Sequence, residues 1–342
     1  MLNFSQWKSF LQSEGISEQQ SEHLANYAER LANRGFPVIF ELEHLSRLLG
    51  VEKNYLYRVM FKGSEFYRTF EINGRRKKRL ISSPYPILSY IQSWIKEQIL
   101  EKFVVSEHAY GYVKSRSILD NAKFHLGCTE LLKLDIKDYF AHISRAMVNR
   151  VFNEAGFTPK LSYQLSKLCC VYGSLPQGAP SSPTLSNLVM RELDQSLFYL
   201  SDFYNIKFSR YADDLAFSGK AIPSDFIVKA VKQIENYGFM LNHEKFTHRK
   251  INQGKMISGL SISGDFVRVP KKTRREFRQK HHYMMLNKEK SFNGVHGDFD
   301  LLSLDKLIGL GQFIKFIEPN NTFVIRAVDD LNLLKKEIFR TG

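Results

Sequence analysis

Residues 207–218 read Lys-Phe-Ser-Arg-Tyr-Ala-Asp-Asp-Leu-Ala-Phe-Ser, which predicts two short strands around the polar turn Ala212-Asp213-Asp214. Two adjacent carboxylates on a tight turn repel each other unless a cation neutralises them. A third carboxylate, Asp135, lies at the end of the apolar, strand-length run at 131–136. Mg²⁺ prefers oxygen ligands and shares them with phosphates, and two such ions roughly 3.5–4 Å apart can clamp a phosphoryl transfer. Adjacent aspartates alone are usually a solvated turn, so this interpretation depends on the rest of the chain.

The remaining pattern predicts an α+β fold. Residues 1–60 have helical periodicity, and one predicted helix face carries Leu24, Tyr27, Ala28 and Leu31. This part faintly resembles a helix-turn-helix, but a helical cap packed on the main domain is the simpler interpretation. Asn73-Gly74 predicts a hairpin turn in a basic stretch, a helix follows at 86–102, and residues 270–342 are again helical and basic. Mixed helices and hairpins followed by helices indicate a layered α+β domain and a helical one.

Charge and aromatic content favour a nucleic-acid partner. The chain has 342 residues, with 49 Lys plus Arg against 35 Asp plus Glu, a formal net charge of +14, and 27 Phe and 16 Tyr. Lys and Arg neutralise phosphates, and aromatic rings stack on bases. An anionic membrane surface is the alternative partner, but it would favour one basic amphipathic helix. Here the basic residues occur in several separate blocks.

Composition and cysteine content exclude several other protein classes. Hydrophobic residues are 43% and charged residues 25%, which excludes a disordered, collagen-like or coiled-coil chain. No apolar run approaches the roughly 18 residues of a membrane span, and the first residues lack the pattern of a secretory signal. Cys128, Cys169 and Cys170 form no zinc-type pattern and are expected to be small buried hydrophobes. We therefore expect a cytoplasmic protein.

Four segments, in the family's own order, carry a resemblance to reverse transcriptases from about residue 60 to 270. Tyr211-Ala212-Asp213-Asp214 resembles their YxDD box. Leu134-Asp135-Ile136-Lys137-Asp138-Tyr139-Phe140 resembles the box with their first catalytic aspartate. Leu175-Pro176-Gln177-Gly178 resembles the LPQG box of intron and retron enzymes, and residues 238–245 resemble the following box with its lysine.

Two further segments resemble the bacterial retron branch of that family. Asn121-Ala122-Lys123-Phe124-His125 is similar to the retron NAxxH signature. Ile257-Ser258-Gly259 stands where retrons carry Val-Thr-Gly and departs conservatively at its first two positions. The residues after 262 suit a helical thumb, and they are too few for an RNase H domain or an intron-type endonuclease.

The resemblance implies the roles of the catalytic residues. Asp135, Asp213 and Asp214 are expected to be catalytic and to hold two Mg²⁺ ions. Lys245 matches the lysine proposed to protonate the leaving pyrophosphate, although an ordinary surface lysine is an equal alternative. Phe140 stands where the family places the bulky side chain that blocks a nucleotide 2′-OH, although a core phenylalanine is the alternative.

The resemblance also implies a nucleotide-binding set, which comprises Arg79, Ile136, Phe140, Gln177 and Lys245. Arg79 matches the fingers arginine that grips the triphosphate. Gln177 is expected to contact the incoming nucleotide and template, and Gly178 permits a close backbone approach.

An RNA-binding set is expected in two places. Asn121 and His125, an i, i+4 pair, either pin a helix to the palm or orient RNA, and the sequence does not decide between them. A helix after the palm would place basic side chains on one face, where the family has its thumb. This set comprises Lys271, Lys272, Arg274, Arg275 and Arg278, with the rings of Phe277, His281, His282 and Tyr283 available to stack on unpaired bases. A solvated basic face is the alternative.

The sequence is thus identified as a member of the retron-type reverse transcriptases with a right-hand polymerase fold. We expect an N-terminal helical extension at 1–60, fingers at 61–130, a palm with an interleaved fingers segment at 131–269, and a thumb at 270–342. The resemblance implies an RNA-directed DNA polymerase that copies a structured non-coding RNA from dNTPs. It also implies priming from a guanosine 2′-OH and an anti-phage role with a separate effector protein. The alternatives are a group II intron-like or diversity-generating enzyme, and a non-catalytic RNA-binding scaffold.

Overall fold

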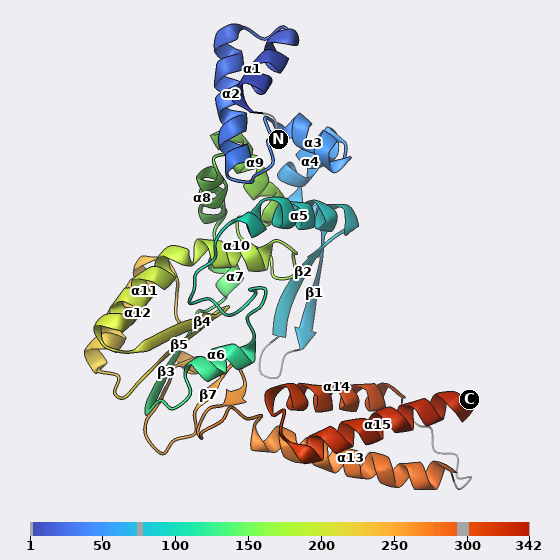
Figure 1. Cartoon of the computed structure of the whole chain (residues 1–342). Coiled ribbons are helices and arrows are strands. Elements are labelled where there is room, and N and C mark those ends of the chain that lie inside the picture. Colours follow the sequence, from blue (N-terminus) through green and yellow to red (C-terminus); the bar gives the residue numbers. More distant parts are fainter. Residues whose placement is uncertain (1–2, 74–77, 293–300, 342) are drawn as a thin grey trace. The chain divides into compact units, whose positions relative to one another are not determined.

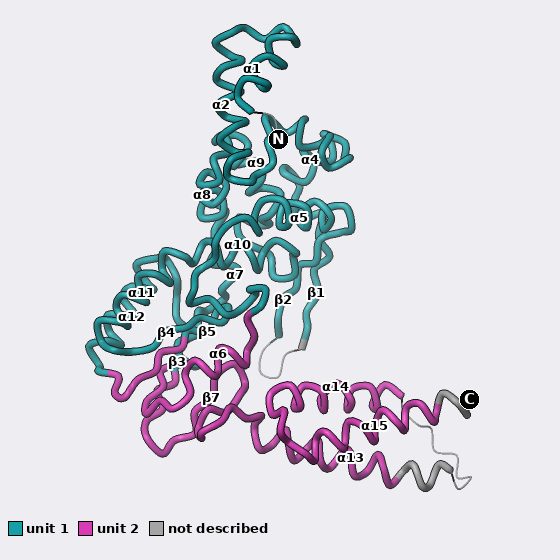
Figure 2. Tube along the Cα trace, in the orientation of Figure 1, with its two compact units in different colours: residues 1–115, 133–215, 223–246 teal, residues 116–132, 216–222, 247–342 magenta. Residues whose placement is uncertain are grey.

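Helices and short antiparallel strands alternate along the chain, as expected for an α+β protein (Figure 1). The computed structural model describes residues 3–73, 78–292 and 301–341. The chain divides into two units, coloured separately in Figure 2. The first unit comprises Met1–Ser115, Lys133–Leu215 and Pro223–Phe246, and the second comprises Arg116–Leu132, Ala216–Ile222 and Thr247–Gly342.

The first unit begins with the predicted helices α1 Phe4–Ser13, α2 Glu18–Asn33, α3 Leu42–Leu49 and α4 Lys53–Phe61. Gly50 ends α3 in the left-handed conformation that glycine adopts at helix C-termini. Arg34 donates to the carbonyls of Glu154 and Ala155, and the Phe36 ring centroid lies 6.3 Å from that of Phe157. These contacts support the helical-cap interpretation of the N-terminal segment.

A two-stranded hairpin follows the short helix η1 Gly63–Phe66. Strands β1 Tyr67–Asn73 and β2 Lys78–Pro84 pair antiparallel, with Tyr67 opposite Pro84, so the predicted basic hairpin is confirmed. Gly74 of the predicted turn lies outside the described residues. The helix expected at 86–102 ends earlier, as α5 Pro86–Gln98 followed by η2 Leu100–Lys102.

The other helices of this unit pack in two groups, with α8 against α9 and α10, and α11 against α12. Their bounds are α7 Tyr139–His142, α8 Arg145–Ala155, α9 Pro159–Cys169, α10 Ser182–Val189, α11 Arg191–Phe203, α12 Ser224–Asn236 and η3 His243–Lys245. Helix α11 packs against α12 and against β4 (Figure 1). Asn187 on α10 and Asp194 on α11 are fully buried polar residues. Buried polar groups need partners, and both side chains accept hydrogen bonds from Arg210 of β4.

Four strands form one sheet in the order β4-β5-β3-β6. Their bounds are β3 Glu130–Asp135, β4 Lys207–Tyr211, β5 Asp214–Gly219 and β6 Thr247–Arg249. Only Ala212 and Asp213 join β4 to β5, and a two-residue connection permits only antiparallel pairing. The two runs predicted at 207–218 are therefore a hairpin, and Asp135 is the last residue of a neighbouring strand.

The second unit contains α6 Ile118–Phe124, β7 Met256–Ile257, β8 Leu260–Ser261, α13 Lys271–Phe292, α14 Leu301–Ile317 and α15 Thr322–Thr341. The helical C-terminal region is thus confirmed. Phe277, Leu304 and Leu331 are buried in one apolar core with residues of α6 and β7. A β-carbon on Gly311 would stand 2.6 Å from Val328 Cγ2, so α14 and α15 pack too closely there for any other residue.

The structure also tests the expectations that the cysteines are buried and that the chain has no membrane span. Cys169 and Cys170 are buried, and the partly buried Cys128 packs against the core of the second unit. Burial raises the pKa of the Cys169 thiol to about 12, so it behaves as a small apolar group. Within the described part of the chain, every helix is too short or too polar to cross a bilayer.

Candidate active site

The three predicted aspartates come together at the β4–β5 turn. Asp135 ends β3, Asp213 is the second residue of the turn, and Asp214 is the first residue of β5 rather than part of the turn. The Ile136 amide donates to the Asp213 carbonyl at 3.0 Å, and the Asn242 amide donates to the Asp135 carbonyl at 2.8 Å. These backbone bonds hold Asp135 between the turn and the segment before η3.

The turn itself has a strained backbone. Ala212 has φ +57, and a two-residue hairpin loop with positive φ at its first position normally has glycine there. The left-handed conformation costs an L-residue roughly 1–2 kcal/mol, so the surrounding structure must hold it. Gly111 contributes, because a β-carbon on it would stand 2.7 Å from the Ala212 amide nitrogen.

The aspartates carry more negative charge than the neighbouring cations compensate. Burial, followed by the charges of Asp135 and Asp214, raises the pKa of Asp213 to about 6. Burial also raises the pKa of Asp135, while Lys245 opposes that rise. The Lys245 Nζ donates to both Asp135 oxygens, at 2.8 and 2.7 Å, and the Lys133 Nζ lies 3.6 Å from Asp214 Oδ2. A divalent cation beside Asp213 would relieve this repulsion.

The donor set fits Mg²⁺, although the side chains are not gathered into a closed cage. Throughout residues 3–73, 78–292 and 301–341, no three His, Cys, Asp or Glu side chains converge as a ready metal site. Mg²⁺ is usually bound through one or two carboxylates together with substrate phosphates rather than by an all-protein cage. The raised pKa of Asp213 favours a cation here, because this carboxyl group is buried and lies beside the negative charges of Asp135 and Asp214.

Two aromatic rings lie beside the turn. The half-buried Phe140 has its ring centroid 6.2 Å from that of Tyr112 and 5.3 Å from that of Tyr139. Tyr112 is 48% exposed and has φ +60. Burial raises the pKa of Tyr112, Asp213 and Tyr211 raise it further, and Arg79 opposes them. Tyr112 therefore lies near Asp213 and Arg79, a position that nothing in its own sequence pattern indicates.

The predicted LPQG segment contacts the β1–β2 hairpin. The Gln177 carbonyl accepts from the Ser82 amide at 2.8 Å. Gly178 has φ +122, and a β-carbon on it would stand 2.9 Å from Ile81 Cγ2 and 3.0 Å from the Ser82 carbonyl oxygen. The close approach expected at Gly178 is thus an approach to β2.

The other residues of the predicted nucleotide-binding set differ in how far their side chains are exposed to solvent. Ile136 is only 1% exposed, so the predicted contact with a nucleotide would have to come from its backbone rather than its side chain. Arg79 is an exposed residue of β2, opposite Ile72 of β1. Lys245, in η3, reaches the cluster through Asp135.

Asn121 and His125 are buried in the second unit, at 1% and 0% exposure. The Asn121 amide donates to the Ser258 hydroxyl at 3.0 Å, and His125 Nδ1 lies 2.6 Å from the Ser218 hydroxyl. Both partners belong to the same unit, one on β5 and one beside β7. Burial and these contacts favour the interpretation in which the pair pins a helix, here α6, over direct contact with RNA.

The basic residues of α13 are not equivalent. Lys271, Lys272, Arg275 and Arg278 are exposed, whereas Arg274 is partly buried, with its Nε 3.8 Å from Glu318 Oε1. The Arg278 guanidinium lies 5.1 Å from the Phe323 ring centroid. The expectation that Phe277 offers its ring to bases is wrong, because that side chain is 0% exposed in the core of the second unit.

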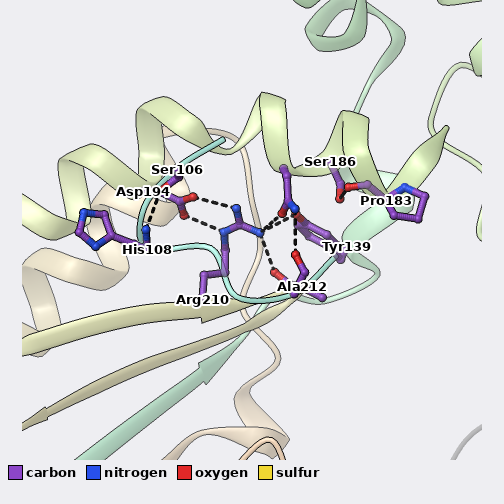
Figure 3. Close-up of polar contacts among 10 residues, drawn as sticks. Ser106, His108, Tyr139, Pro183, Ser186, Asp194, Arg210 and Ala212 are labelled. Carbon is purple, nitrogen blue, oxygen red and sulfur yellow. Dashed lines mark hydrogen bonds and ion pairs between the residues drawn. The ribbon is translucent and has the colours of Figure 1, made fainter. Parts of the chain in front are cut away.

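Sequence reasoning also missed a buried charge beside the turn. Arg210 is 0% exposed and pairs with Asp194, which is equally buried, as Figure 3 shows. An arginine directly before the aspartate box appears in the sequence as one more basic residue. The available signal was its place in a short predicted strand directly after Phe208 and Ser209, which are both buried.

Comparison with known proteins places these features in one family. The family described as reverse transcriptase (RNA-dependent DNA polymerase) matches residues 70–291. Retron Ec86 reverse transcriptase of Escherichia coli is 30% identical, over 84% of this chain and 91% of that protein. Retron Mx162 reverse transcriptase of Myxococcus xanthus is 28% identical, over 85% of this chain and 67% of that protein. A solved structure of telomerase from Candida albicans is 11% identical, with a TM-score of 0.44, and covers 76% of this chain and 56% of that one.

Proposed function

This chain belongs to the retron reverse transcriptases and is an RNA-directed DNA polymerase with the α+β right-hand fold of that family, and we propose that it makes RNA-linked single-stranded DNA. The template is part of a structured non-coding RNA, and the substrates are dNTPs. Synthesis starts from the 2′-OH of a guanosine within that RNA, so the product stays joined to it by a 2′,5′ branch.

One observation supports polymerase chemistry in this chain itself. Burial raises the pKa of Asp213 to about 6, and the negative charges of Asp135 and Asp214 add to that rise, as expected for a carboxylate in a cation-binding site. We propose that these three residues hold two Mg²⁺ ions. The ions would supply charge stabilisation for the attacking oxygen and the leaving pyrophosphate.

The chain's own groups then bind and orient the nucleotide. Arg79 on β2 binds the triphosphate as a positive charge, and Gln177 contacts the nucleotide and template from the loop that adjoins β2. Phe140, flanked by Tyr112, narrows the space beside the sugar C2′ and excludes a 2′-OH. Lys245, held on Asp135, is within reach of the site and delivers a proton to the leaving pyrophosphate.

The proposed division of labour follows the sequence boundaries given above. Fingers and palm, from residue 61 to 269, bind substrates and carry out the chemistry. The thumb, from residue 270, binds the cognate RNA through the basic face of α13. Asn121 and His125 support the RNA-binding region from inside, since their side chains are buried. The protein acts in the bacterial cytoplasm, in defence against phages, together with a separate effector protein.

Sequencing of copurified nucleic acid tests this proposal. The protein is expressed with the non-coding RNA encoded beside it, and nucleic acid is extracted from the purified complex. The expected result is a DNA strand joined to RNA. Treatment with a 2′,5′-debranching enzyme should cut that junction and release free DNA. Linear DNA without a branch would instead favour an intron-like or diversity-generating enzyme. Bound RNA without any DNA would favour the non-catalytic scaffold.

A further inference from the structure

A buried guanidinium lies beside the predicted catalytic turn. Arg210 is the fourth residue of β4, two positions before Ala212, and its side chain is fully buried. Its Nε and Nη2 donate to the two oxygens of Asp194 on α11, each at 2.7 Å. This is the bidentate geometry in which arginine binds a carboxylate most specifically.

The remaining donor, Nη1, faces the catalytic elements. It donates to the Ala212 carbonyl oxygen at 3.3 Å, to the Tyr139 hydroxyl at 3.3 Å and to Asn187 Oδ1 at 3.0 Å (Figure 3). Ala212 precedes Asp213, and Tyr139 precedes Phe140. One nitrogen of Arg210 therefore contacts both the residue before Asp213 and the residue before the proposed sugar gate, Phe140.

The same arrangement reaches the loop that carries Tyr112. Asn187 Nδ2 donates to the Gly111 carbonyl at 2.8 Å, and the Tyr110 amide donates to the Arg210 carbonyl at 2.7 Å. The Arg210 amide in turn donates to the His108 carbonyl at 2.8 Å. The segment around Ala109 thus runs parallel to β4 and beside it at Arg210. The next residues bring Gly111 into close contact with Ala212.

Stability alone does not explain why this charge is present. A buried ion pair is costly to desolvate, and apolar residues of similar volume in its place are often equally stable. What an apolar pair cannot supply is a directed donor for the Ala212 carbonyl. That bond fixes the orientation of the peptide that joins Ala212, in its strained left-handed conformation, to Asp213.

We propose that Arg210 is a positioning residue, oriented by Asp194, that sets the Asp213 turn and the Phe140 gate relative to each other. The same buried side chain would then fix the positions of both the proposed metal-binding carboxylate, Asp213, and the proposed nucleotide-selecting ring, Phe140. This inference rests on the polymerase activity of the family and not on the proposed priming reaction. Its test therefore uses a generic annealed primer and template.

The first variant is Arg210→Lys, which keeps a positive charge beside Asp194 and removes the fork that reaches Ala212 and Tyr139. We expect kcat to fall about 100-fold, since misplacement of about 1 Å can have that effect. The Mg²⁺ concentration for half-maximal rate should rise several-fold, and preference for dNTP over rNTP should fall several-fold. Arg191→Lys is the matched control, because Arg191 on α11 pairs with Glu154 and bonds the Leu188 carbonyl. Its metal and nucleotide responses should equal those of the parent.

A double variant separates positioning from folding. Arg210→Met with Asp194→Leu removes both charges and keeps an apolar filling, so the melting temperature should return to near that of the parent. A restored melting temperature with kcat still about 100-fold low supports the positioning role. Restoration of kcat, metal response and nucleotide preference to within threefold of the parent overturns it. Equal changes in Arg210→Lys and Arg191→Lys also overturn it.

Discussion

Gly111 and Ala212 lie so close together that a β-carbon on Gly111 would stand 2.7 Å from the Ala212 amide nitrogen and 3.2 Å from the Tyr211 carbonyl carbon. These are backbone atoms, so no side-chain rotation can relieve the contact. Gly111 does not have a positive φ, so this position requires glycine for steric reasons rather than for its backbone conformation. The loop that contains Gly111 therefore packs directly against the β4–β5 turn, which precedes the proposed metal ligand Asp214 and contains Asp213.

Gly111→Ala should displace that turn. Insertion of a methyl group into a closely packed contact typically costs about 1–3 kcal/mol, and here the strain falls on the peptide between Tyr211 and Ala212, one residue before Asp213. We expect at least a tenfold loss of kcat on an annealed primer, measured at saturating dNTP and Mg²⁺. Gly63→Ala is the matched control, because the space around Gly63, in η1, is open. An active Gly111→Ala enzyme would show that the turn tolerates the shift.

Asp213→Asn should abolish DNA synthesis and leave RNA binding nearly intact. The change keeps the side-chain volume but removes the charge at the centre of the carboxylate cluster. Metal-ion clamping contributes several kcal/mol of transition-state stabilisation, so a loss of roughly 10³-fold or more is expected. Primer extension and RNA gel shifts on the same preparation make the comparison. Appreciable synthesis would refute the assignment of Asp213 as a metal ligand.

The same substitution should stabilise the protein when Mg²⁺ is absent. Burial and two like charges raise the pKa of Asp213 to about 6, above the unfolded value near 3.8. A raised carboxyl pKa destabilises the fold at neutral pH and ceases to do so once the group is protonated. Asp213→Asn should therefore raise the melting temperature in EDTA at pH 7.5, and the gain should shrink as pH falls through 6 toward 4. A gain that is independent of pH would contradict this charge argument.

The elements that carry the chemistry could be predicted because their patterns are local. The strands around Ala212, the strand before Asp135 and the C-terminal helices follow from apolar runs and helical periodicity. The depth of individual residues could not be predicted, because it depends on what packs from distant segments. Phe277 and Arg274 belong to the same basic helix, yet one is core and the other faces Glu318.

Long-range hydrogen bonds were equally invisible to the sequence. Arg210 pairs with Asp194 across 16 residues and Asn187 reaches Gly111 across 76, and no pattern marks either pair. Asn121 and His125 stand out in the sequence as an i, i+4 pair, but the sequence does not decide what the pair does. Their burial against Ser258 and Ser218 needed the fold.

Phe140→Val should admit ribonucleotides. The change opens space beside the Tyr112 ring, 6.2 Å away between centroids, without altering a metal ligand. Ribonucleotide incorporation should increase by roughly ten- to a hundredfold relative to dNTP, at a modest loss of dNTP use, in single-nucleotide primer extension. The control is Phe203→Val, because Phe203 is 78% exposed on α11. Unchanged discrimination would return Phe140 to the alternative of an ordinary core residue.

The exposed basic residues of α13 should determine binding of the cognate RNA. Lys271 and Arg275 stand four residues apart on one helix face, where like charges repel by a few tenths of a kcal/mol, and a polyanion would relieve that repulsion. Arg274 and Arg278 are left unchanged in the test, because Glu318 and Phe323 engage them within the unit. Lys271→Glu with Arg275→Glu should weaken RNA binding. It should also flatten the salt dependence by roughly 0.7–0.9 of a logarithmic unit for each lost phosphate contact.

The matched control for this pair is Lys306→Glu with Lys336→Glu, an equal charge change at exposed positions of α14 and α15. Self-primed synthesis on the cognate RNA should fall more than extension of a generic annealed primer in the α13 variant, because the aspartate site is unaltered. An equal fall in both reactions would make α13 a general clamp on the duplex rather than a specificity element. If neither reaction falls, or if the control pair has the same effect, the basic face of α13 is simply solvated and the net charge of +14 accounts for the binding.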